Sequence, residues 1–176
     1  MGSRLSVQAG VRGRPSLRAI ARIGLAAFAL GTARASADLT ENFDSSASAP
    51  AGWVDVGTAN DNLNTHYVSA PNCRALGVGD TLQTPPVDYP TNLAFYVDSS
   101  SGGNGQTATV DYNVDGGAWS PLASFTVSTA GATRNIPLIA APNLSLNQAV
   151  RFRFVSTFNT WYLDNVVIRT GSAATS

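Results

Sequence analysis

Lysine is absent from the 176-residue chain, and cysteine and histidine each occur once. The lone Cys73 excludes an intramolecular disulfide, so stability must come from packing, hydrogen bonds or a bound ion. One cysteine and one histidine are too few for a zinc centre built from several such ligands. The chain also lacks a Gly-x-Ser-x-Gly segment, so a hydrolytic triad would have to be built around His66 without it. These absences predict a protein that is not an enzyme, with Cys73 buried or in a loop and His66 structural.

Long apolar runs are also missing. Residues 23–30 form a short apolar stretch, well below the roughly 20 residues of a membrane-spanning helix. Five arginines precede it, and the small residues 35–37 follow it, which is the pattern of a secretory signal peptide. We therefore expect a signal peptide at 1–37, a β-sandwich domain at 38–170 and a short flexible tail at 171–176. A retained membrane anchor is the alternative reading. The predicted location is extracellular or at the cell surface, with the periplasm as a further option.

Removal of the leader would change the charge balance. The whole chain has eleven arginines and eleven acidic residues, but six arginines lie within the leader and every acidic residue follows it. The expected mature domain therefore carries five positive and eleven negative charges, a net charge of −6. An acidic, lysine-free domain is a poor partner for nucleic acid or for anionic membrane surfaces. Neutral ligands or cations fit this charge better.

The chain after the leader is predicted to be almost entirely β. Residues 107–114 and 150–154 alternate apolar and polar side chains, with Arg151 and Arg153 on the polar side. Residues 115–117, Asp-Gly-Gly, can supply the positive φ angles of a tight hairpin. Further strands are expected at 39–43, 53–56, 66–69, 75–78, 92–97, 119–125 and 133–139. Many short strands punctuated by glycine, proline, asparagine and serine predict an all-β jelly-roll sandwich of two antiparallel sheets.

One acidic residue, Asp164, interrupts the apolar run 161–168 near the C-terminus. Aromatic and β-branched residues otherwise mark this run as a buried strand. A buried carboxylate must be hydrogen-bonded, paired or metal-bound, because its desolvation alone is too costly. We therefore predict that Asp164 either helps to bind a cation or accepts backbone N–H bonds at a strand end, and the sequence favours neither.

The two ends of the expected domain carry a more specific pattern. Residues 41–44, Glu-Asn-Phe-Asp, and 49–53, Ala-Pro-Ala-Gly-Trp, open it, and the run 161–168 closes it. Together they resemble the MAM-like jelly-roll modules of exported bacterial proteins, including cleaved-adhesin and choice-of-anchor type domains. The resemblance implies a concanavalin-like sandwich whose first and last strands lie close together. It also implies a structural calcium or sodium ion between the chain ends. The residues at the matching positions are Glu41, Asp44, Asp164 and the Asn165 carbonyl.

The same resemblance implies a secreted module that binds carbohydrate or protein and catalyses nothing. Sugar binding needs aromatic faces beside hydrogen-bonding side chains, and residues 158–161 place both types in one loop. The candidate contact residues are Phe158, Asn159, Trp161, Tyr67 and Trp119. Aromatic side chains in a sandwich also commonly pack in the core, so that alternative stays open.

Three hypotheses for the function follow. The leading one is binding of carbohydrate or extracellular matrix, and the alternative is a protein-binding adhesion or assembly subunit. A small hydrolase with a carboxylate pair is the third, because eleven acidic residues offer many pairs. Exposed aromatics in a groove would favour the first, a flat apolar patch or an exposed strand edge the second, and two facing acids in a cleft the third.

Overall fold

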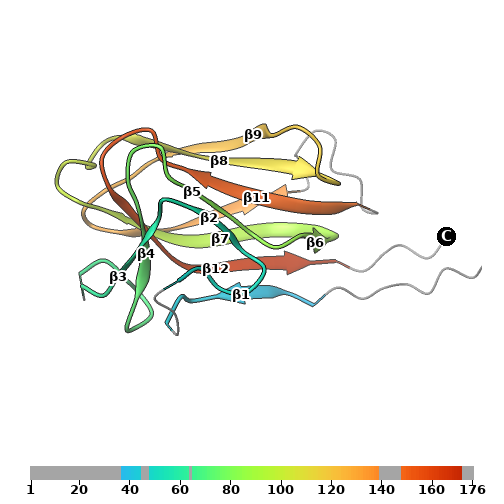
Figure 1. The fold of residues 1–176 in the computed structure, drawn as a ribbon, viewed down its shortest axis with the longest axis horizontal. Helices are drawn as coiled ribbons and strands as arrows, with labels where there is room; N and C mark the ends of the chain where they lie inside the picture. Colours follow the sequence, from blue (N-terminus) through green and yellow to red (C-terminus); the bar gives the residue numbers. More distant parts are fainter. Residues whose placement is uncertain (1–36, 45–47, 64, 139–147, 172–176) are drawn as a thin grey trace, which may run out of the picture. The chain divides into compact units, whose positions relative to one another are not determined.

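The computed structural model describes residues 37–44, 48–63, 65–138 and 148–171, which form two antiparallel sheets of six strands each (Figure 1). The strands of sheet A are β1 (Leu39–Glu41), β3 (Ala59–Asp61), β4 (Cys73–Leu76), β7 (Pro90–Ser99), β10 (Ala132–Pro137) and β12 (Trp161–Thr170). The strands of sheet B are β2 (Val54–Val56), β5 (Thr81–Gln83), β6 (Val87–Asp88), β8 (Thr107–Val114), β9 (Ser120–Thr126) and β11 (Ala149–Val155). Apart from one residue each, the expected signal peptide and C-terminal tail lie outside the described residues and stay predictions.

The strand order is β10-β7-β12-β4-β3 in sheet A, with β1 also paired to β12. In sheet B the order is β2-β5-β11-β8-β9, with β6 also paired to β11. The predicted all-β jelly-roll sandwich of two antiparallel sheets is therefore confirmed. Among the described residues we find no helix long and apolar enough to cross a membrane.

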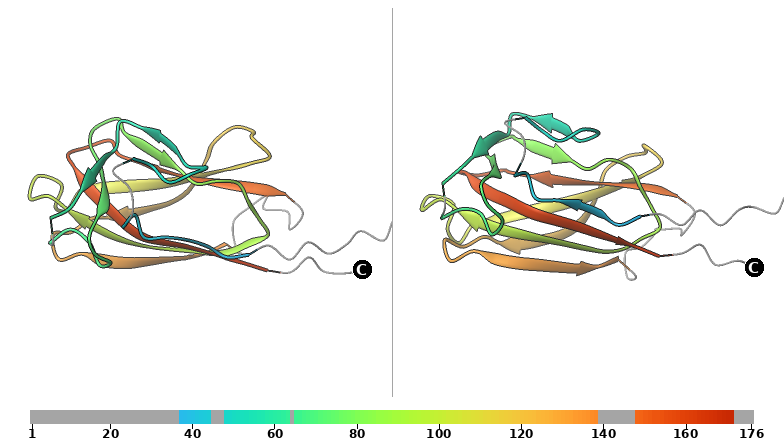
Figure 2. Two further views of the ribbon diagram at one scale, coloured as in Figure 1. Left: turned by 60° about the horizontal axis from the view of Figure 1, so that its bottom comes forward. Right: turned by 90° about the horizontal axis from the view of Figure 1, so that it is seen from below.

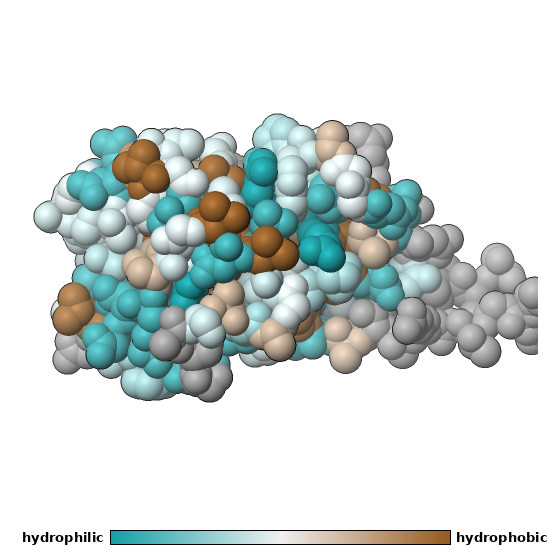
Figure 3. Space-filling view, in the orientation of Figure 1, coloured by the Kyte–Doolittle hydropathy of each residue, from teal (hydrophilic) through white to brown (hydrophobic). Residues whose placement is uncertain are grey.

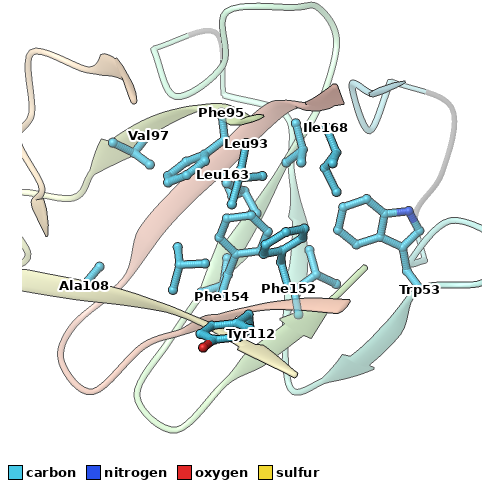
Figure 4. Packing of buried hydrophobic residues seen from close by; sticks show 14 of the residues in the cluster. Trp53, Leu93, Phe95, Val97, Ala108, Tyr112, Phe152, Phe154, Leu163 and Ile168 are labelled. Carbon is cyan, nitrogen blue, oxygen red and sulfur yellow. The ribbon is translucent and has the colours of Figure 1, made fainter. Parts of the chain in front are cut away.

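The core lies between the two sheets and is filled by alternate residues of each strand. On β11, Phe152 and Phe154 are completely buried, whereas Arg151 and Arg153 stay partly exposed on the other face. Phe154 meets Phe95 of sheet A with 5.1 Å between ring centroids (Figure 4). The predicted alternation of residues 150–154 thus holds and puts both arginines on the outer face of sheet B.

A buried ion pair joins the two sheets at one end. Arg74 of β4 pairs in register with the core residue Leu163, and Asp55 of β2 pairs with the core residue Leu82, so both charged side chains point inward. The Arg74 guanidinium, 1% exposed, donates to the Asp55 carboxylate and, from Nε, to Thr58 Oγ1 at 3.1 Å. Because an unpaired buried charge is costly, this contact holds the two strands in place.

The β8–β9 hairpin turns as the sequence predicts. Asp115 and Gly116 have φ angles of 49° and 74°, the left-handed values that a two-residue hairpin turn requires. The Gly117 N–H donates to the Val114 carbonyl at 2.9 Å. The turn is also tied to the start of β11, because Ala149 N–H donates to Asp115 Oδ1 at 3.0 Å and Asp115 N–H donates to the Ala149 carbonyl at 2.8 Å. These bonds fix one wall of the site described below.

The first and last strands lie side by side, as the resemblance implies. Leu39 of β1 is the register partner of Ile168 of β12 (Figure 2). Closer to the start of β12, the register with β7 shifts between Asp164 and Val167, and Asn165 adopts a φ of 48° there. This bulge inserts one extra outward residue, so the strand returns its apolar residues to the core after Asp164.

The main difference from the sequence prediction is in residues 66–69, which form bends rather than a strand. This segment crosses the outer face of sheet A and gives the N–H groups of Val68 and Ser69 to the Asp164 side chain. A side-chain acceptor thus replaces a neighbouring strand as the partner of this backbone. The short strands β3, β5 and β6 were not predicted.

Candidate ligand-binding site

The outer face of sheet B contains a hollow of about 470 Å³. This volume lies within the roughly 300–1,000 Å³ of small-molecule sites. Strands β5, β8 and β11 contribute to its floor, and the β8–β9 hairpin forms one wall. Its polar and aromatic lining consists of Gln83, Asn113, Asp115, Trp119 and Arg151. The mixture of one aromatic ring with several hydrogen-bonding groups suits a polar ligand that also has an apolar face.

The strand register explains why these side chains meet. Gln83 of β5 pairs with Arg153 of β11, and Arg153 pairs with Asp111 of β8. Two residues earlier on β11, Arg151 pairs with Asn113 of β8. Side chains directly opposite each other on antiparallel strands point to the same face. The outer face of sheet B therefore carries the five side chains of these pairs, Gln83, Arg153, Asp111, Arg151 and Asn113, which point away from the core.

The ring of Trp119 is held in place by an arginine. The Arg153 guanidinium carbon lies 4.5 Å from the centroid of the Trp119 ring, a cation–π contact. Arg153 is itself fixed by an ion pair with Asp111, in which Nε donates to Oδ2 at 3.2 Å. A ring held in this way loses little freedom when a ligand binds against it. Trp119, one of the sequence candidates, is thus at the hollow.

Two polar side chains at the hollow lack partners within the described residues. Asn113 is only 6% exposed, and its Oδ1 is buried without a hydrogen bond. Arg151, its cross-strand neighbour, makes no hydrogen bond or ion pair there. A buried acceptor without a donor costs about 1–3 kcal/mol, so such groups call for a ligand or water. Sequence reasoning did not select either residue, although the outward position of Arg151 follows from the alternation along β11.

The other loop candidates lie away from this hollow. Trp161 is completely buried and meets Phe125 edge-on with 5.8 Å between ring centroids. The ring is thus enclosed by the protein in this structure, as the core alternative describes. Phe158 packs partly against the core, whereas Asn159 is exposed. A role for Phe158 and Asn159 in ligand binding stays a prediction.

Tyr67, the remaining candidate, lies on the outside of sheet A. It packs against a small cluster formed by Cys73, Ala75 and Tyr162. Cys73 is a buried free thiol, and burial raises its pKa, which disfavours the reactive thiolate. This agrees with the prediction of a buried structural cysteine. The five predicted contact residues therefore do not form one surface.

Asp164 lies on the outer face of sheet A, beneath the segment that contains residues 66–69, and is completely buried. Its Oδ2 accepts hydrogen bonds from the N–H groups of Val68 and Ser69, both at 2.8 Å. Its Oδ1 accepts one from the Ser69 hydroxyl at 3.0 Å and one from the Asn165 N–H at 2.6 Å. Four donors satisfy both carboxylate oxygens. The hydrogen-bond alternative therefore accounts for the burial of this charge without an ion.

The other two acidic residues of the implied ion site are Glu41, the last residue of β1, and Asp44, which follows shortly after it. Glu41 accepts the Phe43 N–H at 2.7 Å, and one carboxylate oxygen of Asp44 accepts from the Asn42 side chain. The second oxygen of Asp44, Oδ1, is buried and has no hydrogen-bond partner among the described residues. In the part of the chain that is described, no three His, Cys, Asp or Glu side chains are grouped to hold a metal. Of the implied side-chain ligands, Asp44 has a carboxylate oxygen that is available to a cation. Both carboxylate oxygens of Asp164 already accept hydrogen bonds.

A second polar cluster lies on the outer face of sheet A. The ring of His66 stacks on Tyr162 with 3.7 Å between centroids, and His66 Nδ1 is 3.2 Å from Asp61 Oδ1. Asp98, the register partner of Tyr162, is 2% exposed. Burial raises the pKa of the Asp98 carboxyl, and the effect is partly opposed by the Ser99 N–H and by His66. This cluster is covered by the chain itself, in contrast to the hollow on sheet B.

The sequence matches no protein-family model and no curated protein. Solved structures with a similar fold include two cleaved adhesin domains of Lys-gingipain. The K1 domain, from Porphyromonas gingivalis W83, has a TM-score of 0.56 at 19% identity, and the alignment covers 77% of this chain and 99% of that domain. The K2 domain has a TM-score of 0.57 at 17% identity, with the same coverage.

The fold is also similar to that of the CBM22-1 xylan-binding domain from Paenibacillus barcinonensis. That comparison has a TM-score of 0.56 at 17% identity and covers 81% of this chain and 100% of the xylan-binding domain. At such identities the similarity shows a shared fold. The chain thus has the jelly-roll architecture of adhesin domains and of a carbohydrate-binding module.

Proposed function

We propose that the chain is a secreted, non-catalytic module that binds carbohydrate through the hollow of sheet B. One observation carries this proposal: the hollow combines the held ring of Trp119 with Asn113 and Arg151, which lack partners among the described residues. Sugar rings offer an apolar face for stacking and a rim of hydroxyls for hydrogen bonds. The likeness in fold to a xylan-binding domain supports the same reading.

The acidic residues at the hollow support binding rather than hydrolysis. Glycoside hydrolysis uses two carboxyl groups that flank the scissile bond. The lining of the hollow contains one, Asp115, whose Oδ1 accepts a backbone N–H. Asp111, on the same face, is paired with Arg153. A lone carboxylate at the hollow can orient a sugar hydroxyl, but it does not supply an acid and a base together.

The exposed apolar side chains support a sugar ligand over a protein partner on the face shown in Figure 3. Apolar areas on that face are small and separated by polar ones (Figure 3). Among the described residues, the large hydrophobic side chains exposed by 40% or more are Val54 and Val56, which share one face of β2, and Leu63, Val68 and Val78. Protein-docking sites commonly gather such residues into a patch of a few hundred Å². A protein-binding adhesion role is the alternative that the following experiment also tests.

The test is a binding screen of purified residues 38–176 against a panel of soluble glycans and polysaccharides, with calcium present. We expect binding to at least one glycan class. Trp119→Ala should weaken that binding about tenfold or more, because it removes the stacking surface. Circular dichroism and thermal melting would show that the variant folds. A well-folded protein that binds no glycan would overturn the proposal and favour the adhesion alternative.

A matched variant separates the hollow from the loop at residues 158–161. Asn159 is exposed, and its side chain accepts only the adjacent Thr160 N–H at 2.9 Å, so Asn159→Ala should fold normally. If the hollow is the site, Asn159→Ala binds glycan as well as the wild type does. Loss of binding in Asn159→Ala, with binding retained in Trp119→Ala, would move the site to the loop.

We also propose a structural calcium or sodium ion at the end of β1, held by Asp44 and Glu41. The buried, unpartnered Oδ1 of Asp44 supports this placement, and oxygen ligands suit both ions. Asp164 and Asn165 then act through hydrogen bonds rather than as ligands. Calcium should raise the melting temperature and a chelator should lower it, and Asp44→Asn should abolish the difference. A melting temperature unaffected by both additions would exclude a calcium ion.

A further inference from the structure

Among the described residues, Arg151 at the hollow on sheet B forms no ion pair, although Asp115 also lines this hollow. We propose that its ligand is an acidic sugar, a uronic-acid-containing glycan, whose carboxylate binds Arg151. This inference rests on the proposed carbohydrate binding and adds the chemical class of the ligand. It follows from the partners of the arginines and from the groups that surround Arg151.

Arg151 differs from the other four arginines of the described residues. Three of these contact a carboxylate: Arg74 with Asp55, Arg153 with Asp111 and Arg169 with Asp38. The fourth, Arg134, donates to the Thr126 carbonyl and lies over the Phe125 ring. Within the same residues, Arg151 has neither a hydrogen bond nor an ion pair. The residue is nevertheless only partly exposed and lines the hollow.

A carboxylate is the group that best matches this guanidinium. Arginine stays charged at any physiological pH and presents its N–H donors in a planar fork. A carboxylate can accept two parallel N–H bonds from that fork, and such charge-assisted bonds are about twice as strong as neutral ones. A neutral hydroxyl would use one donor and leave the charge of Arg151 uncompensated.

The groups around Arg151 suit the rest of a uronic acid ring. Asn113, directly opposite Arg151, has a buried Oδ1 that can accept a hydroxyl hydrogen. Asp115 Oδ1 accepts the Ala149 N–H, and the other carboxylate oxygen of Asp115 can accept a second hydroxyl. Trp119 offers an apolar surface at the hollow. A carboxylate on one side of the ring and hydroxyls on the other would thus meet complementary partners.

The net negative charge of the domain acts at a different range. Beyond about 8 Å, charges are largely screened at physiological ionic strength, whereas a contact ion pair in a partly desolvated hollow is screened less. The overall charge therefore slows the approach of a polyanion, while Arg151 acts on the carboxylate that reaches the hollow. Short acidic oligosaccharides should accordingly show the preference more clearly than long polyuronates.

The test compares acidic sugars with neutral derivatives of the same sugars. Titration calorimetry would use trigalacturonic acid and its methyl ester, and a glucuronic-acid-substituted xylo-oligosaccharide before and after reduction of its carboxyl group. We expect at least one acidic member to bind about tenfold or more tightly than its neutral partner. Equal or tighter binding of the neutral members would overturn the acidic ligand and leave carbohydrate binding intact. No binding to any glycan would overturn both.

Variants then assign the preference to one side chain. Arg151→Gln should abolish the difference between the acidic and neutral members, and Arg151→Lys should restore only part of it, because lysine keeps the charge but loses the fork. The matched control is Arg169→Gln, which removes the same charge from sheet A, where Arg169 is 63% exposed. An acidic preference that survives in Arg151→Gln, or disappears equally in Arg169→Gln, would contradict the assignment.

Discussion

The outer faces of the two sheets carry similar polar residues but differ in what covers them. On sheet A, the chain folds back over Asp164 and gives it three of its four hydrogen-bond donors, and His66 stacks on Tyr162. On sheet B, Arg151 and Asn113 point outward and have no partner for their key polar groups in the described residues. An outward polar residue is thus structural where the chain returns to cover it, and is available to a ligand where the chain does not.

The largest effect should come from removing the covered carboxylate. Asp164→Ala removes the charged acceptor of the N–H groups of Val68, Ser69 and Asn165, and each hydrogen bond to a charged group contributes about 1.5–3 kcal/mol. We expect the free energy of unfolding to fall by about 4 kcal/mol, as measured by urea denaturation. Binding by the protein that remains folded should be unchanged, because Asp164 is on the opposite sheet. A fall of less than 1 kcal/mol in the free energy of unfolding would show that the hydrogen bonds to Asp164 do not hold residues 66–69 in place.

A smaller effect, of the opposite sign, is expected at Asp98. Its raised pKa means that the folded state keeps a proton at pH values where the unfolded chain, with a carboxyl pKa near about 3.9, has lost it. Stability therefore falls as the pH rises from the unfolded value through the folded one. Asp98→Asn removes this loss and can still accept the Ser99 N–H. The variant should melt higher than the wild type at pH 7 and the same at pH 3, and equal melting at both would contradict the prediction.

A still smaller effect is expected at the exposed ion pair between Asp38 and Arg169. Hydrogen bonds from Arg169 and from the Thr170 N–H lower the pKa of the Asp38 carboxyl. A lowered folded pKa adds stability above the unfolded value and loses it as the pH falls through the folded value. Asp38→Asn should therefore lower the melting temperature slightly at pH 7 and not at pH 2. Added salt should reduce the difference, because exposed pairs are screened.

The smallest effect on stability should come from the uncovered face. Asn113→Ala removes a buried acceptor that has no partner among the described residues, but it also removes packing, and because the two effects oppose each other we expect the free energy of unfolding to change by only about 0.5 kcal/mol in either direction. Glycan affinity should fall severalfold in the same variant. This pattern would be the reverse of that in Asp164→Ala. A stability loss of several kcal/mol would show that Asn113 is structural and would weaken the case for the hollow.

Local sequence patterns predicted much of this architecture. The alternation of residues 107–114 and 150–154 gave the two strands and the outward direction of Arg151 and Arg153, and Asp115-Gly116 gave the hairpin turn. Asp164 was recognisable because a charge in an apolar strand needs partners. These features depend on neighbours within a few residues, which is why the sequence alone could indicate them.

The parts that sequence reasoning missed depend on contacts between distant segments. The hollow exists because β5, β11 and β8 align Gln83 with Arg153, which is 70 residues away, and Asn113 with Arg151, which is 38 residues away. Residues 66–69 contain β-forming side chains, but their backbone binds a side chain ninety-five residues away. The burial of Trp161 had a usable signal, since it lies two residues before the core residue Leu163 and so shares its face.

The pairing of β1 with β12 has a mechanical consequence. Leu39 lies opposite Ile168, and Asp38 bonds to Arg169 and Thr170, so both ends of the described sandwich leave at the same edge. A pulling force applied between those ends would open the antiparallel hydrogen bonds one after another instead of loading them all at once. The three residues of β1 would peel away first. Sheet B and its hollow would keep their geometry until that strand had gone.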